Sequence, residues 1–359
     1  MLKVAVIGLG GNGTHKLRVL ANCNRVNGLI GMDLDSERTA VVAGELGIPT
    51  TTNLDEILTD TAVKLVFVSS SNDAHKELTL AAMASNKAVL CEKPMANTLD
   101  DAHEMVEAAE QGEQFLEIGF EARHSKLYAT IKKWIDAGLL GEVVNTHCKY
   151  ISSEFWGRNS WRVTSAGCGN MFGEKLSHYV DLPRWWIGAE VTEVYSVCAP
   201  TVVPYFEVND NYHTTYKFSN GAVSHITFMM APAATFRGDP LQDVIGQQEG
   251  DGHVLRFLIC GTRGAAETDV FGRTIKRWQF GDSEHGMTSD LVETLTWQPA
   301  DDHLYFHNTT DHTLDIVRRV DEGLPPSCPA PDAYETTRLC FAAEHSAAIG
   351  KPVQMSSFS

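Results

Sequence analysis

Lys93 stands where a side chain could act on a substrate oxygen. It follows Glu92 at the end of an apolar run and immediately precedes Pro94. A residue before proline has a restricted backbone, so we expect Lys93 to project from the end of a strand. A cation in that place can hydrogen-bond a substrate oxygen and stabilise a developing alkoxide. The pattern is equally compatible with a surface lysine before a turn.

A second group of reactive side chains follows within residues 169–181. Glu174, His178 and Asp181 have the spacing i, i+4, i+7, which places them on one face of an α-helix. A histidine between two carboxylates can serve as a tuned general base. The alternatives are a histidine satisfied by its helix neighbours and, ranked lower, a metal site. No further ligand cluster accompanies these residues, so we expect no metal.

The N-terminal segment predicts a dinucleotide site that would bring a cofactor to these residues. An apolar run ends in the glycine cluster Gly8, Gly10, Gly11, Asn12 and Gly13, and a helical pattern follows. Gly8 permits a tight turn, Gly10 leaves room for a pyrophosphate, and Gly13 lets the helix pack closely on the strand. The start of the helix offers free N–H groups to the phosphates.

An acidic residue lies at the distance that a ribose-binding carboxylate requires. Asp33 ends the second apolar run, about twenty residues after the last glycine, where it can accept hydrogen bonds from a ribose diol. Asp33 and Asp35 would repel a 2′-phosphate, which favours NAD over NADP. Arg38 is the residue that could accommodate such a phosphate.

Strands alternate with helices up to about residue 120, which predicts a doubly wound parallel sheet and an α/β domain over residues 1–122. The pattern places a helix at residues 36–46, ended by Gly47, a buried strand at residues 63–68 and a later helix capped by Thr98. Ligands bind beyond the carboxyl ends of the strands in such sheets. The turn with Ser69, Ser70 and Asn72 and the strand end at Glu92 and Lys93 therefore join the candidate cofactor site.

The pattern changes to short strands with one embedded helix, which predicts an α+β domain over residues 123–359. Strand-like runs lie between residues 143 and 280, and Asn220-Gly221 and residues 262–264 are hairpin turns. Residues 236–252 are expected to be a long loop. The last helix, over residues 332–349, could pack back on the first domain.

Composition limits the possible partners. The chain has 359 residues and a formal net charge of −17, which argues against nucleic acid and anionic membranes. Its eight cysteines are scattered without C-x-x-C pairs, as in reducing compartments. We expect no leader peptide, no membrane-spanning stretch and a cytoplasmic location.

Several motifs together resemble the Gfo/Idh/MocA oxidoreductases, named after glucose-fructose oxidoreductase and inositol dehydrogenase. They are VAVIGLGGNG, the Asn72 and His75 of SNDAH, CEKP at 91–94, GFEAR at 119–123, NSWR at 159–162 and the His178/Asp181 helix. The resemblance implies a Rossmann domain joined to an α+β domain with a large, open, mostly antiparallel sheet. It also implies a homo-oligomer, a dimer, tetramer or higher, assembled through that sheet.

The resemblance assigns roles to individual residues. It makes Lys93 the catalytic lysine and His178 the acid/base, with Asn72 and His75 at the cofactor. Glu174 stands where many members have aspartate, and Leu176 where glycine is usual. These departures bear on which group accepts the proton and on which substrate fits.

The resulting hypothesis is an NAD-dependent dehydrogenase that oxidises a secondary hydroxyl of a sugar, a glycoside (including the glucoside 3-position) or a cyclitol such as inositol. Glu174 would orient His178 or hold a neighbouring hydroxyl. Aromatic faces and forked donors suit polyols, so candidate substrate residues are Arg123, Trp156, Arg158, Trp161 and Arg162. Two other classes stay open, a redox-neutral NAD-dependent glycosidase and a non-catalytic cofactor-bound regulator.

Overall fold

The computed structural model describes residues 1–154, 156–233 and 252–358. The chain divides into two compact units. Residues 1–121, 166–169 and 309–337 form the first unit, and residues 122–165, 170–308 and 338–359 form the second. The expected division at residue 122 differs from this one, because residues 166–169 and 309–337 lie with the first unit. A loop was expected at residues 236–252, and its residues 236–251 lie outside the described part of the chain.

The first unit is built on a six-stranded, all-parallel sheet. Its spatial order is β3-β2-β1-β4-β5-β6. This is the doubly wound Rossmann order, in which the order reverses between β1 and β4. The strands are β1 (Leu2–Ile7), β2 (Val26–Met32), β3 (Thr50–Thr51), β4 (Val63–Val68), β5 (Ala88–Glu92) and β6 (Leu116–Gly119).

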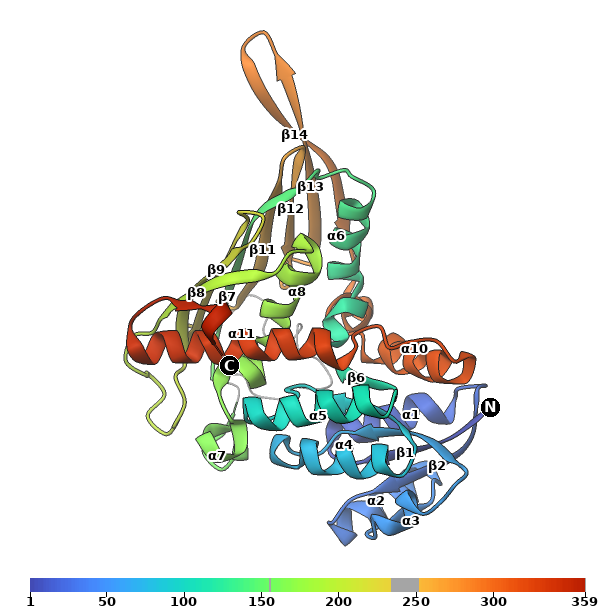
Figure 1. Cartoon of the computed structure of the whole chain (residues 1–359). Coiled ribbons are helices and arrows are strands. Elements are labelled where there is room, and N and C mark those ends of the chain that lie inside the picture. Colours follow the sequence, from blue (N-terminus) through green and yellow to red (C-terminus); the bar gives the residue numbers. More distant parts are fainter. Residues whose placement is uncertain (155, 234–251, 359) are drawn as a thin grey trace. The chain divides into compact units, whose positions relative to one another are not determined.

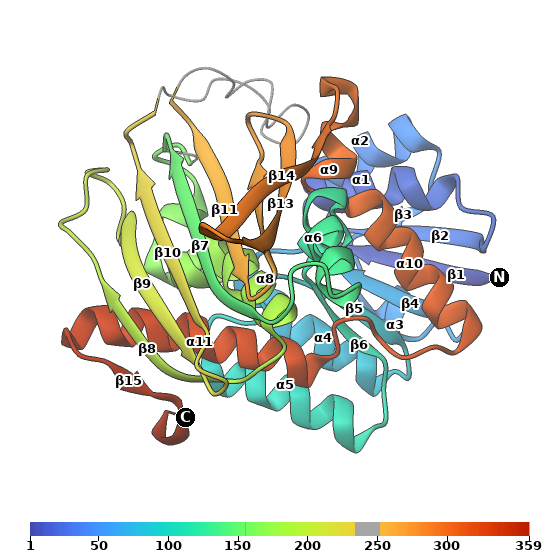
Figure 2. The same cartoon turned by 90° about the horizontal axis from the view of Figure 1, so that it is seen from above.

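Helices cover both faces of this sheet because alternate strand residues point to opposite sides. Val4 and Val6 of β1 pack with α1 (Gly11–Ala21), α2 (Ser36–Leu46) and α10 (Thr309–Glu322). Ala5 and Ile7 pack with the other core, formed with α3 (Asp55–Leu58), α4 (His75–Ala84), α5 (Leu99–Gln111) and the first turns of α11 (Ala330–Ile349). Figure 2 shows α1 and α10 on one side of the sheet and α4 and α5 on the other.

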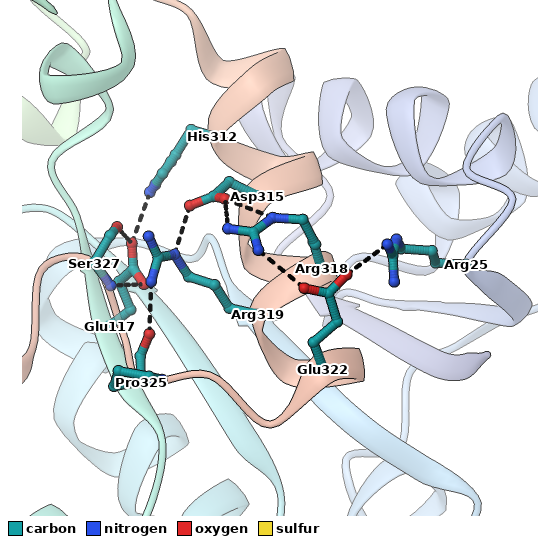
Figure 3. Close-up of polar contacts among 9 residues, drawn as sticks. All are labelled: Arg25, Glu117, His312, Asp315, Arg318, Arg319, Glu322, Pro325 and Ser327. Atoms are coloured by element: carbon teal, nitrogen blue, oxygen red, sulfur yellow. Dashed lines mark hydrogen bonds and ion pairs between the residues drawn. The ribbon is translucent and has the colours of Figure 1, made fainter.

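The returning segment 309–329 is fixed to the first unit by a buried polar cluster (Figure 3). Glu117 of β6 is fully buried, and its carboxylate accepts hydrogen bonds from the backbone N–H and the hydroxyl of Ser327, at 2.9 and 2.5 Å. The Nε2 atom of His312, which is buried on α10, lies 3.5 Å from the same carboxylate. Around this centre, Arg319 bridges Asp315 and the carbonyl of Pro325.

The second unit contains a nine-stranded sheet. Its spatial order is β14-β13-β12-β11-β7-β10-β9-β8-β15, and every neighbouring pair is antiparallel except β7 and β10. The strands are β7 (Val143–Ser152), β8 (Val191–Val197), β9 (Asn211–Phe218), β10 (Val223–Met230), β11 (Val254–Gly261), β12 (Gly264–Asp269), β13 (Thr274–Ser283), β14 (Gly286–Thr296) and β15 (Val353–Gln354).

One face of this sheet carries the core of the second unit. Tyr128 of α6 (Lys126–Asp136) and Trp186 of α8 (Ser177–Ile187) both meet Phe257 of β11 edge-on. Farther along the sheet, Tyr212 of β9 donates to Glu344 of α11 at 2.6 Å. The alternating burial of β7, β9, β10 and β11 leaves the other face of the sheet more exposed.

Two differences from the sequence prediction concern local structure. Strand β14 was not predicted; it pairs with β13 in a hairpin that extends beyond the neighbouring strands (Figure 1). The helix expected over 171–186 begins instead as a π-helix at Phe172–Leu176, before α8. The remaining short elements are α7 (Ser165–Cys168), α9 (Asp302–Tyr305) and single turns at Asn72–Ala74, Glu121–His124, Trp161–Val163, Pro299–Asp301 and Met355–Ser357.

Among the helices of the described ranges, none is both long and apolar enough to cross a bilayer.

Candidate functional site

The glycine loop between β1 and α1 has the geometry of a phosphate-binding turn. Gly8 has a φ of +89°, and a Cβ there would lie 2.6 Å from the backbone of Ser69. A Cβ on Gly13 would lie 1.8 Å from the carbonyl oxygen of Gly8. A Cβ on Gly10 would meet no described atom within 4 Å. Two glycines are therefore required by close backbone approach, and the third borders open space in which a pyrophosphate fits.

Helix α1 directs its N-terminus at this loop. It begins at Gly11, after an N-cap glycine, and has no acidic side chain in its first turn. The first N–H groups of a helix have no intrahelical acceptor and attract anions. Asn12 lies in this first turn, and its side-chain oxygen accepts a hydrogen bond from Lys16 at 3.3 Å. The loop thus fits the phosphates of a dinucleotide.

Asp33 ends β2 and is held as a carboxylate. Its Oδ2 accepts from the backbone N–H of Leu9 at 2.8 Å and from Arg38 at 3.1 Å, and its Oδ1 accepts from the N–H of Asp35 at 3.0 Å. Partial burial tends to raise the pKa of Asp33, but these hydrogen bonds outweigh it and hold the pKa below its ordinary value. An ionised carboxylate at this strand end fits a ribose diol. Arg38 is turned toward Asp33 and Asp35.

His75 ties together two segments that were assigned to the cofactor. Its ring lies 1% exposed, with Nδ1 2.8 Å from the carbonyl of Pro94 and Nε2 3.3 Å from the carbonyl of Ser70. Carbonyl oxygens only accept hydrogen bonds, so both ring nitrogens must donate, which requires the imidazolium form. Burial alone would lower the pKa of His75, but Cys91 and the Pro94 carbonyl raise it to about 9. His75 therefore positions the Ser70 turn against the strand end at Pro94.

The other residues of the β4 turn lie close to this anchor. The backbone N–H of Ser69 donates to the carbonyl of Ile7 at 2.7 Å, which joins the ends of β4 and β1. Asn72 is buried, and its side-chain amide lies 3.5 Å from the carbonyl of Cys168. The first unit thus brings the glycine loop, Asp33 and the β4 turn to the same ends of its strands.

Glu92 and Lys93 end β5, and a lysine that the sequence did not single out holds the glutamate. Lys16 of α1 is fully buried, with Nζ 2.6 Å from Glu92 and 3.3 Å from the side-chain oxygen of Asn12. Gly119 makes room for the same carboxylate, since a Cβ there would lie 2.7 Å from it. The Lys93–Pro94 peptide bond is cis. Lys93 belongs to the first unit and His178 to the second.

The π-helix changes the expected relation between Glu174 and His178. Residues with the spacing i, i+4 lie on one face in an α-helix. Phe172–Leu176 is a π-helix, in which the backbone hydrogen bonds join residues i and i+5, so this spacing no longer keeps two residues on one face. The prediction of one continuous α-helical face was therefore wrong between these two residues. Both side chains are buried, at 5% and 4% exposed. Short π segments often occur at functional sites.

Glu174 and Asp181, which lie on the same stretch of chain as His178, are each held by an arginine from another segment. Arg123 binds Asp181 through two hydrogen bonds of 2.7 and 2.6 Å, and Asp181 is fully buried. Arg162 donates to Glu174 at 2.7 Å. Bidentate arginine–carboxylate pairs fix orientation as well as charge. His178 therefore lies on a helix whose acidic residues are already oriented.

The candidate substrate residues form two groups in the second unit. Trp156 stacks on Phe206 with ring centroids 5.8 Å apart, and Arg158 lies 4.6 Å over the ring of Tyr205. Arg162 lies 4.2 Å over Trp161 while it binds Glu174. Arg123 belongs to neither group, because it forms the buried pair with Asp181.

Sequence reasoning missed several residues of this site. Lys16 carries a weak signal, a lysine on the apolar face of α1, and Tyr205-Phe206 is an aromatic pair after a proline. His307 carries no local signal. Its ring lies edge-on to His178 with centroids 6.0 Å apart, although 129 positions separate the two residues.

Comparison with known proteins gives the family of the chain. Residues 2–120 match the Gfo/Idh/MocA model described as "Oxidoreductase family, NAD-binding Rossmann fold", and residues 128–267 match the C-terminal domain of the same family. Inositol 2-dehydrogenase of Salmonella typhimurium is 29% identical over 197 residues, 54% of this chain and 56% of the relative. The match thus spans about half the length of that curated relative.

Two further relatives are similar over nearly the whole chain. Inositol 2-dehydrogenase of Mycolicibacterium smegmatis is 25% identical over 99% of this chain and 96% of its own. The structure of levoglucosan dehydrogenase in complex with NADH and levoglucosan has a TM-score of 0.80, at 21% identity and 98% coverage of both chains. The two matched domains, in this order, show that the chain belongs to the Gfo/Idh/MocA oxidoreductase family, with an NAD-binding Rossmann domain at residues 2–120.

Proposed function

We propose that the protein is an NAD-dependent dehydrogenase that oxidises a secondary hydroxyl of a sugar, a glycoside or a cyclitol to a ketone. The observation that carries this proposal is His178, buried on α8 with its neighbouring carboxylates oriented by Arg123 and Arg162. A buried imidazole in a fixed polar surrounding is suited to general-base chemistry. Family membership supplies the oxidoreductase context.

The residues divide the chemistry between them. His178 takes the proton of the substrate hydroxyl as general base. Lys93 hydrogen-bonds the same oxygen and stabilises its negative charge. NAD, when held by the glycine loop and Asp33, supplies the acceptor for the hydride that leaves the carbon. Glu174, fixed by Arg162, orients the substrate or His178.

NAD is the proposed cofactor rather than NADP. Asp33 is ionised and partly buried, so it would repel a 2′-phosphate. Arg38 would favour the phosphate, but it is paired with Asp33 and Asp35.

The relatives indicate the substrate class. Their names include inositol 2-dehydrogenase, 1,5-anhydro-D-fructose reductase and levoglucosan dehydrogenase. All these substrates are cyclic polyols or their anhydro forms. Stacked Trp156 and Phe206 offer an aromatic face of the kind that sugar rings contact. We therefore propose a cyclic polyol, with a glycoside or sugar preferred over inositol.

The proposal is tested by following reduced nicotinamide with NAD, and then NADP, against a panel of sugars, glucosides and inositols. We expect turnover with one substrate group. Replacing Lys93 by Met should lower kcat/KM by about a hundredfold to a thousandfold. Replacing His178 by Asn should lower it by about a hundredfold to ten-thousandfold. NAD binding measured by calorimetry should be unchanged in His178→Asn and nearly intact in Lys93→Met.

Lys64→Met is a matched control, because Lys64 is an exposed lysine of β4 in the same unit. It should leave turnover unchanged. Near-normal turnover in Lys93→Met would sink the assignment of that lysine. Cleavage of a glycoside without net NADH would instead show a redox-neutral glycosidase, and NAD binding without turnover would show a regulator.

We further propose a homo-oligomer assembled through the exposed face of the nine-stranded sheet, and a cytoplasmic location. Large apolar side chains are exposed on its strands, including Leu258, Tyr195 and Leu291, and exposed apolar patches often mark interfaces. A single-protomer mass in sedimentation would contradict the oligomer.

The proposed cytoplasmic location is supported by the eight cysteines, which are all free thiols, as suits a reducing compartment.

A further inference from the structure

His307 is the second imidazole of the region around His178. The two rings lie edge-on, with centroids 6.0 Å apart and an interplanar angle of 71°. Their exposure differs, since His178 is 4% exposed while His307 is partly exposed. A deeply buried base has little direct access to bulk water, and its nearest imidazole neighbour has more.

The segment that carries His307 is held rigidly from one side. It belongs to the connection between β14 and α10. In this connection the ring of Tyr305 stacks on Trp297, with ring centroids 4.5 Å apart and an interplanar angle of 1°. Trp297 donates its indole N–H to Asp302 at 2.8 Å, and Arg273 binds the two oxygens of Asp302 at 2.8 Å each. These contacts fix the backbone just before His307.

The same segment is anchored again on both sides of His307. The hydroxyl of Ser125 donates to the carbonyl of Tyr305. The side-chain amide of Asn308, which is fully buried, donates to the carbonyl of His124 at 3.1 Å. The ring of Phe306 packs on His307 with centroids 4.1 Å apart. An irregular connection fixed by this many buried contacts gives His307 a defined place beside His178.

We propose that His307 relays to solvent the proton that His178 takes from the substrate. This inference rests on the proposed function. The substrate O–H bond breaks and its proton goes to His178, while the C–H bond breaks and its electron pair goes with the hydrogen to NAD. The proton then passes from His178 to His307, directly or through one water, and from His307 to bulk water. Each turnover releases one proton, and both imidazoles return to their starting forms.

The two acidic residues that are closest to His178 along the helix favour an imidazole as the next carrier. Glu174 and Asp181, on the same stretch of chain, each already accept hydrogen bonds from an arginine. Those arginines, Arg162 and Arg123, come from neighbouring segments and cannot accept a proton. A neutral imidazole has one nitrogen that accepts and one that donates, which is what a relay requires.

The test separates hydride transfer from proton release in a single turnover. Reduced nicotinamide is followed by its absorbance, and the proton by an indicator dye in weak buffer. In the unchanged protein both signals should rise together. In His307→Gln the hydride signal of the first turnover should keep its rate, while proton release should slow by about tenfold or more. Added imidazole should restore the release rate.

His303→Gln is the matched control, because His303 is an exposed histidine of α9 in the same connection. It should leave both signals unchanged. If proton release in His307→Gln keeps pace with hydride transfer, the relay is overturned. Slow release that imidazole does not restore also overturns it, since a missing carrier is replaceable and a distorted site is not.

A second measurement needs no turnover. In the protein without substrate, nitrogen NMR at constant pH follows the exchange of the His178 ring N–H with bulk water. This exchange should slow in His307→Gln, because the buried ring loses the neighbouring imidazole through which its proton reaches water. Unchanged exchange in His307→Gln overturns the relay. If no polyol is oxidised at all, the dehydrogenase proposal fails, and this exchange rate still decides whether His307 carries protons between His178 and water.

Discussion

The two units differ in what fixes the geometry of their candidate residues. In the first unit the cofactor loop is set by backbone proximity, because Gly8 and Gly13 approach Ser69 and each other too closely for a Cβ. In the second unit His178 is surrounded by side-chain pairs, such as Arg123 with Asp181, whose partners lie far apart in sequence. The positions of Gly8 and Gly13 tolerate no added atom, whereas the surroundings of His178 depend on keeping charges matched.

The largest expected effect comes from adding one methyl group to the backbone site. In Gly13→Ala the new Cβ would lie 1.8 Å from the Gly8 carbonyl, so the helix must move away from the loop. We expect a loss of at least about 3 kcal/mol in unfolding free energy, the upper end of overpacking costs. Chemical denaturation of the cofactor-free protein measures it.

Gly10→Ala is the matched control, because its Cβ meets open space. This variant should keep its unfolding free energy and lose NAD affinity by at least about tenfold, since the methyl group occupies space for the pyrophosphate. Equal stability losses in the two variants would show that the loop is not limited by backbone contact. Normal NAD affinity in Gly10→Ala would move the cofactor away from the loop.

The second expected effect comes from breaking the charge match in the other unit. Asp181→Asn removes the carboxylate that holds Arg123 through two hydrogen bonds and leaves that guanidinium without its counter-charge in a buried place. Breaking a buried pair from one side costs about 3–5 kcal/mol, less where the replacement still accepts hydrogen bonds. Denaturation of the variant measures the loss.

Asp136→Asn is a control with the same substitution in an exposed pair. Asp136 binds Lys132 at 2.5 Å, but its side chain is 59% exposed, so its effect should stay below about 1 kcal/mol. A similar loss in both variants would contradict the distinction between the buried and the exposed pair.

The same contrast explains how much of the molecule could be predicted from sequence. Helix α2 (Ser36–Leu46), ended by Gly47, and strand β4 (Val63–Val68) were predicted at their observed bounds. Thr98 caps α5 by accepting from the N–H of Asp101, as expected. These features depend on neighbouring residues, so apolar period, caps and glycines are enough to predict them.

The features that were missed depend on contacts distant in sequence or on a local irregularity. The pair of Arg123 with Asp181 joins positions 58 apart, and His307 meets His178 from a different connection. Strand β14 has little apolar pattern because most of its residues are exposed. The π-helix inserts a wider turn that no spacing rule in the sequence marks. The sequence therefore singled out His178 as a candidate, but it could not predict the side chains that surround His178.

Glu117 departs from the rule of the cofactor loop, because a side-chain cluster rather than backbone proximity fixes segment 309–329 in the first unit (Figure 3). Burial tends to raise the pKa of Glu117, but hydrogen bonds from His312 and Ser327 outweigh it and lower the pKa from 4.5. A carboxyl group whose pKa is lower in the folded than in the unfolded protein stabilises the fold at pH values above its unfolded pKa. That stability is lost as the pH falls through the lowered value.

The smallest expected effect is therefore confined to acid. In the unchanged protein the unfolding free energy should begin to fall just below pH 4.5 and continue to fall until the lowered pKa of Glu117 is passed. Glu117→Gln should lose about 1–3 kcal/mol at neutral pH, because the amide is a weaker acceptor for Ser327. It should also lack this part of the acid-dependent decline. Denaturation curves at a series of pH values measure both changes.

Glu322→Gln separates the buried carboxylate from the charges around it. Glu322 belongs to the same group in Figure 3, where it pairs with Arg25 and Arg318, but its side chain is 39% exposed. Exposed pairs contribute little, so this variant should follow the acid profile of the unchanged protein. If Glu117→Gln followed that profile as well, the cluster would hold segment 309–329 without the charge of Glu117. Segment 309–329 would then be held by apolar packing and by hydrogen bonds that need no charge on Glu117, unlike the charged pair of Arg123 with Asp181 in the second unit.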